Sequence, residues 1–255
     1  MYPFTAITAA YNSAKFLPDT IQSMQKQTVG QWQMIIIDDG STDNTFQIAS
    51  MFKSDPRIKV FRLPRNMGVG FAKAYAAELA SGDIIGILDS DDTLEPNAVK
   101  TIIDYYHKEN VEFAHTMFRF CDQNLQPQKH NGKDRLGSTG MPEKYDSFLD
   151  YTIANPHDCH VSLMLTFTQG IYQRSAKMSP HFKNAVDKDL VLKLEEAGAS
   201  MNCIPEVLYN YRRHSNSLGS TKKHDCMPQI IFDAQNRRSR IQQEEAQKTW
   251  DQVNP

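Results

Sequence analysis

Residues 82–92 read Gly-Asp-Ile-Ile-Gly-Ile-Leu-Asp-Ser-Asp-Asp, an apolar run that ends in three carboxylates within four positions. Because the run shows no polar alternation, it predicts a short strand that is buried on both faces, as in a parallel sheet. Asp89, Asp91 and Asp92 would repel one another unless a cation lay among them. Mg²⁺ and Mn²⁺ prefer oxygen ligands, and Mg²⁺ sites usually pair one or two carboxylates with substrate phosphates. The stretch therefore favours a metal and diphosphate site over its alternative, an acidic loop in which Thr93 or Asp92 caps the next helix.

Three similar apolar segments come before this stretch, and helical patterns separate them. Ser13 is the expected N-cap of the first helix. Strands followed by helices, with short joints that contain Gly and Asp, predict an α/β fold with a mostly parallel, Rossmann-like central sheet and helices on both faces. The expected strands cover residues 4–9, 32–37, 58–63 and 84–88, and the expected helices cover residues 16–24, 44–52, 71–79 and 96–107.

The second half of the chain is less regular. Residues 121–144 are polar and without periodicity, which predicts a long loop. Residues 187–197 have a helical pattern that Gly198 ends. The other expected elements are a strand at 113–120, a helix at 146–153, one or two strands within 161–172, extended segments at 200–204 and 207–212, and a helical tail.

Composition limits the classes of protein that fit. A net charge of −2 over 255 residues argues against a general nucleic-acid-binding protein. Four cysteines without paired spacing indicate free thiols in a reducing compartment. No apolar run approaches the ~20 residues of a membrane span, and no signal peptide is visible, so a cytoplasmic location is expected. Basic residues of the tail either contact an anionic membrane peripherally or form a solvated face; they are Lys222, Lys223, Arg237, Arg238 and Arg240.

Four stretches occur in an order and spacing that resemble those of the family 2 glycosyltransferases of the GT-A fold. They are Thr-Ala-Ala-Tyr-Asn at 8–12, Asp-Asp-Gly-Ser-Thr-Asp-Asn-Thr at 38–45, Asn-Met-Gly at 66–68 with Ala-Lys at 72–73, and the acidic stretch. Looser matches at 186–194 and 211–217 extend the resemblance to about residues 4–218. The absence of a Gln-x-x-Arg-Trp segment and of following membrane spans argues against a processive synthase.

The resemblance implies a division of the chain into a nucleotide-sugar-binding half (1–98), an acceptor-binding half of the same GT-A domain (99–220) and a polar helical tail (221–255). Sugar transfer needs groups that hold the nucleotide, a cation that stabilises the diphosphate and a base for the attacking hydroxyl. Tyr11 and Asp39 follow two strand ends, where a nucleotide would lie. The alternatives are that Tyr11 packs under a loop and that Asp39 caps a turn.

By resemblance, the backbone of Ala9 joins Tyr11 and Asp39 in binding uracil, and Asp89 and Ser90 contact ribose or donor sugar. Gly68 allows a turn or a close approach of the backbone to the ligand.

Lys73 stands where the family often has Arg. It is interpreted either as a cation near the nucleotide or as part of a solvated helix face.

The resemblance also implies that Asp91 is a metal ligand and that His214 approaches the same metal or diphosphate from the second half. The cofactor is Mn²⁺ or Mg²⁺, and a histidine ligand suits Mn²⁺ better. The role of Asp92 stays open. The alternative for His214 is a structural histidine.

Asp187 resembles the family's catalytic base, in a motif whose usual Glu is replaced by Val186. Its alternative is an acid that caps a helix, and Asp189 competes for the role of base. The resemblance implies direct displacement with inversion, which a single base without a second carboxylate nucleophile fits.

The expected function is therefore metal-dependent transfer of a hexosyl or N-acetylhexosaminyl group from a UDP-sugar to a glycan or lipid-linked acceptor, in the synthesis of cell-envelope polysaccharide. The alternative is a catalytically degraded relative that binds a nucleotide or a partner. A nucleotidyltransferase is disfavoured because residues 9–12 lack its Gly-rich loop.

Overall fold

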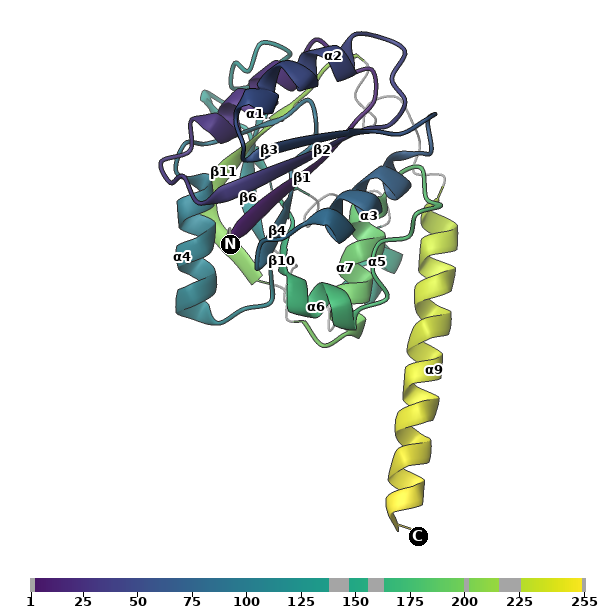
Figure 1. Cartoon of the computed structure of the whole chain (residues 1–255). Coiled ribbons are helices and arrows are strands. Elements are labelled where there is room, and N and C mark those ends of the chain that lie inside the picture. The colour runs from purple at the N-terminus through teal and green to yellow at the C-terminus, as the bar shows by residue number, and fades with distance from the viewer. Residues whose placement is uncertain (1–2, 138–146, 156–162, 200–201, 216–225, 254–255) are drawn as a thin grey trace.

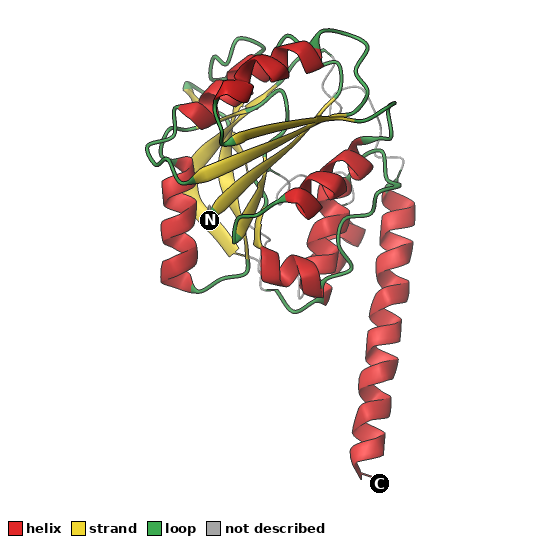
Figure 2. Cartoon of the chain, in the orientation of Figure 1, coloured by secondary structure: helices red, strands yellow, loops and turns green. Residues whose placement is uncertain are grey.

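The apolar segments form a mixed, mostly parallel sheet, drawn in yellow in Figure 2. The computed structural model describes residues 3–137, 147–155, 163–199, 202–215 and 226–253, and side chains up to residue 248. Within these residues the sheet has nine strands. Their order is β3 (Ile58–Arg62), β2 (Trp32–Asp38), β1 (Phe4–Ala10), β4 (Ile84–Ile87), β10 (Thr166–Thr168), β6 (Phe113–Cys121), β11 (Asn202–Arg212) and β5 (Thr93–Leu94), with β9 (Leu136–Gly137) beside β6.

The first four strands of that order are parallel, so their carboxyl ends meet along one edge of the sheet. Phe4 lies opposite Trp32 on one side and Ile84 on the other. β10 is antiparallel to both β4 and β6 and joins the two halves of the sheet. Ligands of open α/β sheets bind outside the carboxyl ends of the strands, and the acidic residues after β4 lie there.

Helices cover both faces of the sheet, as the sequence predicts (Figure 1). Alternate residues of β2 point to opposite faces: Met34 and Ile36 belong to one hydrophobic cluster, and Ile35 and Ile37 to the other. The first cluster includes residues of α1 (Leu17–Gln25), α2 (Thr45–Ser50) and α4 (Ala98–Glu109). The second includes residues of α3 (Val69–Leu79), α5 (Phe148–Ala154), α6 (Gln169–Arg174), α7 (Val186–Glu196) and α9 (Met227–Val253).

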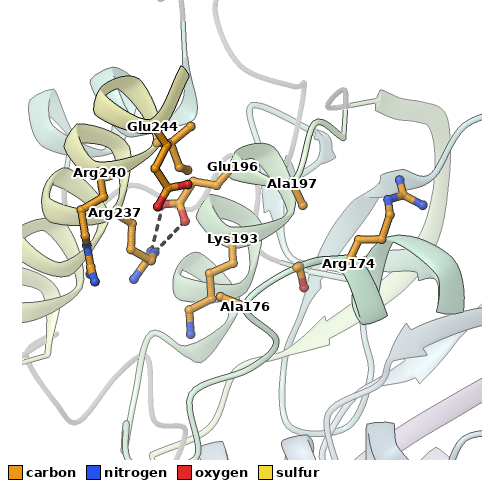
Figure 3. Close-up of a pocket in the computed structure, with 10 residues that line it drawn as sticks. Arg174, Ala176, Lys193, Glu196, Ala197, Arg237, Arg240 and Glu244 are labelled. Atoms are coloured by element: carbon orange, nitrogen blue, oxygen red, sulfur yellow. Dashed lines mark hydrogen bonds and ion pairs between the residues drawn. The ribbon is translucent and has the colours of Figure 1, made fainter. Parts of the chain in front are cut away.

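The long helix α9 extends away from the body of the molecule (Figure 1). Its beginning is anchored, because Ile230 and Ala234 are fully buried against the second cluster. Arg237 donates two hydrogen bonds to Glu196 of α7, 2.6 and 3.0 Å long, beside a pocket of ≈ 340 Å³ between α6, α7 and α9 (Figure 3). Arg238 donates to Ser147 over 3.1 Å. These two arginines therefore attach α9 to the body, which differs from a simple solvated basic face.

Several local expectations are wrong. Ser13 does not cap α1, which begins at Leu17 after Phe16. Neither Thr93 nor Asp92 caps the following helix: Thr93 lies in β5, and α4 begins at Ala98. The expected loop 121–144 contains β7 (Lys129–His130), β8 (Lys133–Asp134) and β9. Two other expectations are confirmed: β10 lies within the segment 161–172, where it is followed by α6, and the described part of the segments expected to be extended forms one strand, residues 202–212, with two register shifts.

Three cysteines are free thiols in the described structure, whereas Cys159 lies outside it; they are Cys121, Cys203 and Cys226. Among the residues described, no helix is both long and apolar enough to span a bilayer.

Candidate active site

The loop after β4 presents Asp89 and Asp91 at the edge of the sheet. Lys73, from the second turn of α3, places its Nζ 2.8 Å from Asp89 Oδ1, and its side chain is only 9% exposed. Burial lowers the pKa of Lys73, but the charges of Asp89, Asp187 and Asp91 outweigh this effect and raise it overall. Lys73 is therefore a fixed cation inside the site, not part of a solvated helix face.

Asp91 contacts a histidine that follows β11, a strand of the second half of the chain. His214, two residues after β11, places Nε2 2.9 Å from Asp91 Oδ2. Burial raises the pKa of Asp91, and the charge of Asp89 adds to the increase. The imidazole ring also packs on Phe16, with ring centroids 4.4 Å apart. Two segments 123 residues apart thus meet at one carboxylate.

The donor atoms of this pair suit a divalent cation such as Mn²⁺, which accepts both carboxylate oxygen and imidazole nitrogen. In the described part of the chain, no three His, Cys, Asp or Glu side chains are arranged to hold a metal ion. Asp91 and His214 therefore fit a site in which substrate phosphates and water supply the remaining ligands, as is usual for Mg²⁺.

Asp92, whose role the sequence leaves open, points away from the site. It has no exposed area, and both of its oxygens accept hydrogen bonds, one from the Tyr209 hydroxyl and one from the Arg212 backbone N–H. Asp92 is therefore a structural acid and not a third ligand.

Residues after β1 and β2 form the other side of the site. Tyr11 is 45% exposed, and Ala9 on β1 is half-buried. Asp39 is buried and accepts hydrogen bonds from the N–H groups of Met67 (2.7 Å) and Gly68 (2.9 Å). Burial raises the pKa of Asp39, and these two bonds oppose the increase. Asp39 therefore holds the turn before α3, in agreement with the alternative that it caps a turn.

The turn before α3 and the start of α3 contact the second half of the chain. Gly68 has φ +97, a left-handed conformation that favours glycine. Gly70 donates to the carbonyl oxygen of Phe182 over 3.2 Å, and a Cβ at position 70 would lie 2.5 Å from that oxygen. The segment before α7 thus packs directly on the turn that Asp39 holds.

The two acids at the start of α7 have different surroundings. Asp187 is half-buried, and its burial raises its pKa while the nearby charges of Lys73 and Lys188 lower it. Asp189 has no exposed area and accepts hydrogen bonds from Lys193 Nζ (2.8 Å) and Ser179 N–H (3.2 Å). Of the two, only Asp187 is close to the charges of the acidic loop.

Sequence reasoning missed the partners that organise the site. Ser13 contacts Ser90, with hydroxyl oxygens 2.7 Å apart, instead of capping a helix. Tyr209 reaches the acidic loop from β11, and only its place five residues before His214 could have signalled this. Ser217, which the sequence groups with His214, lies outside the described residues.

Comparison with known proteins identifies the family of this chain. The family model described as Glycosyl transferase family 2 matches residues 5–176. Chondroitin synthase of Escherichia coli is 31% identical over 229 residues, which cover 89% of this chain and 31% of that protein. The putative teichuronic acid biosynthesis glycosyltransferase TuaG of Bacillus subtilis is 29% identical over 219 residues, or 86% of this chain and 82% of TuaG.

The fold is also similar to that of solved structures. S. aureus TarS 1-349 in complex with UDP-GlcNAc superposes with a TM-score of 0.69 at 18% identity, covering 93% of this chain and 72% of TarS 1-349. This chain spans only 31% of the E. coli chondroitin synthase and 21% of the hyaluronan synthase of Pasteurella multocida. The family model covers most of the chain. The chain belongs to glycosyl transferase family 2 and has the GT-A fold.

Proposed function

We propose that this chain transfers a sugar from a UDP-sugar to a hydroxyl group of a glycan or lipid-linked acceptor, with a divalent metal and with inversion. One observation carries the proposal: Lys73, Asp89 and Asp91 from the first half of the chain meet His214 and Asp187 from the second half. Cations and acids in one cluster supply both the charge that holds a diphosphate and the base that an acceptor hydroxyl requires.

The donor lies along the carboxyl ends of β1, β2 and β4. Exposed Tyr11 stacks on the uracil ring, and Asp39, with the backbone of Ala9, reads its polar edge. Asp89 and Ser90 contact the ribose or the donor sugar, and Gly68 lets the backbone approach. Support for UDP comes from relatives whose names include it: TarS is described in complex with UDP and with UDP-GlcNAc, and WfgD of E. coli is a UDP-Glc-dependent glucosyltransferase.

Asp91 and His214 would hold Mn²⁺ or Mg²⁺, which would supply positive charge to stabilise the leaving diphosphate. Lys73 stays protonated because it is paired with Asp89, and it adds a positive charge without any proton transfer.

Asp187 acts as the general base. It accepts the proton of the acceptor hydroxyl while the acceptor oxygen forms a bond to the anomeric carbon. The bond from that carbon to the diphosphate breaks, and its electron pair leaves with UDP. The Lys73 charge lowers the pKa of Asp187 and so favours the ionised form that can accept a proton. Attack on the face opposite the leaving group inverts the anomeric centre.

The relatives' names support the proposed acceptor class. TuaG is named for teichuronic acid biosynthesis, and WfgD acts on GlcNAc-diphosphoundecaprenol. A glycan or a lipid-linked sugar of the cell envelope is accordingly the acceptor proposed for this chain.

Calorimetry of UDP binding with and without Mn²⁺ tests the proposal. UDP should bind only weakly without Mn²⁺, and Asp91→Ala should remove most of the gain that Mn²⁺ gives. Asp104→Ala, on the exposed face of α4, is the matched control and should behave as wild type. Equal metal-dependent binding in Asp91→Ala would overturn the metal assignment. UDP binding without any sugar transfer would instead favour a non-catalytic relative.

A further inference from the structure

Asp92 is the most buried acid of the acidic loop, and its two partners come from β11. Its Oδ2 accepts from the hydroxyl of Tyr209 over 2.6 Å, and its Oδ1 accepts from the backbone N–H of Arg212 over 2.7 Å. Neither Asp92 nor Tyr209 has any exposed area. Burying a carboxylate is costly unless its oxygens are well bonded, so each of these two bonds is needed to keep Asp92 inside.

Tyr209 also fixes the backbone of the loop. Its hydroxyl oxygen accepts from the N–H of Asp89 over 3.3 Å while it donates to Asp92. Two residues past Asp92, Leu94 pairs with Tyr209 across the β5–β11 ladder. The acidic loop is therefore fastened to β11 at its start, at Asp92 and at its end.

Arg212 continues this attachment toward the metal-binding side. Its side chain is 2% exposed, and its guanidinium donates to Asp19 (2.9 Å) and to the Gln123 carbonyl (3.2 Å). The same guanidinium lies 4.6 Å from the centre of the Phe16 ring, on which His214 also packs. His214 follows Arg212 by two residues, so a fixed Arg212 leaves little freedom in where the imidazole lies.

We propose that Asp92 is a positioning residue, which sets the distance between Asp91 and His214 by fastening the acidic loop to the end of β11 through Tyr209 and Arg212. This inference rests on the proposed function only in taking Asp91 and His214 as the metal-binding pair. Asp92 contacts neither substrate nor metal in this role. It acts entirely through the N–H of Arg212 and the hydroxyl of Tyr209.

Tyr209→Phe is the sharpest test, because it removes the hydroxyl and keeps the ring. Tyr106→Phe is a matched control: Tyr106 is buried in the same hydrophobic cluster, and its hydroxyl bonds to Thr166 over 3.0 Å, away from the acidic loop. Both variants should unfold at a lower temperature: Tyr106→Phe by about 2–6 °C, and Tyr209→Phe by at least as much, because the Tyr209 hydroxyl bonds both to Asp92 and to the N–H of Asp89. Only Tyr209→Phe should weaken UDP binding in the presence of Mn²⁺, by roughly tenfold.

A His214→Ala background separates positioning from general destabilisation. If Tyr209 acts through His214, Tyr209→Phe should cost no further affinity once His214 is absent. An equal loss in both backgrounds would overturn the proposal, as would unchanged affinity in Tyr209→Phe.

The ligand-free protein gives an independent readout. The ¹⁵N shifts of the His214 imidazole, assigned by comparison with His214→Ala, should change in Tyr209→Phe and stay unchanged in Tyr106→Phe. Identical His214 shifts in the wild type, Tyr209→Phe and Tyr106→Phe would overturn the positioning role whether or not UDP binds. Failure of UDP to bind the wild type, with changed His214 shifts, would instead count against the proposed function and support the positioning role.

Discussion

The acidic loop after β4 and the start of α7 arrange their aspartates in the same way, although they belong to opposite halves of the chain. Each carries closely spaced aspartates, and in each one acid lies among the charges of the site while its neighbour is buried as a structural group. Asp91 meets His214 while Asp92 bonds to Tyr209. Asp187 lies near Lys73 while Asp189 bonds to Lys193.

The two regions differ in what neutralises the buried acid. Asp92 is held by neutral donors, a hydroxyl and a backbone N–H, whereas Asp189 is held by a buried ammonium group. A hydroxyl positions a loop without adding charge beside a metal-binding pair. Removing one partner of the ion pair within α7 should destabilise the protein strongly, because it leaves a buried unpaired charge. The comparison teaches that spacing of acids predicts a site, while the partners decide which acid belongs to it.

Replacing Asp187, the half-buried acid at the start of α7, should have the largest effect. Asp187→Asn keeps the shape of the side chain and removes the base, so kcat should fall by roughly 10²- to 10⁴-fold. UDP affinity measured by calorimetry should stay close to that of wild type. Full activity in Asp187→Asn would mean that another residue is the base. The start of α7 would then not share the arrangement of the acidic loop.

Replacing the buried member should affect stability instead of chemistry. Asp189→Ala leaves Lys193, which is 5% exposed, without its carboxylate, so the free energy of unfolding should fall by roughly 3–5 kcal/mol in urea titrations. The double variant Asp189→Leu with Lys193→Met removes both charges and should recover most of that loss. A large fall in kcat with unchanged stability would contradict this division of roles.

The sequence could predict the positions of these acids but not their directions. Residues 82–92 indicate a strand and a polar end, because a buried strand must be apolar and a ligand must meet polar groups. Which carboxylate turns inward depends on Tyr209 and Arg212, more than one hundred residues away, and no local pattern encodes such a contact. The expectation that Ser13 caps a helix was wrong for a related reason, since tertiary partners override local propensity.

Gly70 of α3 packs directly against the segment that precedes α7. Gly70→Ala places a Cβ 2.5 Å from the Phe182 carbonyl oxygen, so the segment before α7 must shift, at about 1–3 kcal/mol of unfolding free energy. Gly170→Ala is the control, because a Cβ in α6 would meet its nearest atom at 3.7 Å, an ordinary contact, and should be neutral or stabilising. Differential scanning calorimetry of both variants separates them. Equal stability would mean that the two halves adjust to each other freely.

Acidity should change catalysis through Asp187. The base must be ionised, and burial raises its pKa above the ordinary aspartate value of 3.8, with Lys73 and Lys188 opposing the increase. As pH falls below that raised pKa, kcat should decrease about tenfold per pH unit. Lys73→Met should move this decrease in kcat, the acid limb of the pH–rate profile, to higher pH, because it removes a charge that favours the carboxylate. A limb that stays in place in Lys73→Met would mean that Lys73 does not act on the base.

The smallest effect should come from the second ion pair of α7, which sharpens the contrast with the first. Arg237 and Glu196 have side chains 19% and 14% exposed, whereas those of Lys193 and Asp189 are 6% and 1% exposed. Water can partly solvate the partner that remains, so Arg237→Gln should lower the free energy of unfolding by only about 1 kcal/mol. Activity should not change, because this pair attaches α9 and contacts none of the proposed site residues. Urea titrations of Arg237→Gln and Asp189→Ala compare the two pairs on one helix. If both variants lost the same free energy, burial would not be what separates the two pairs of α7, and the assignment of Asp189 as the structural acid would lose its physical basis.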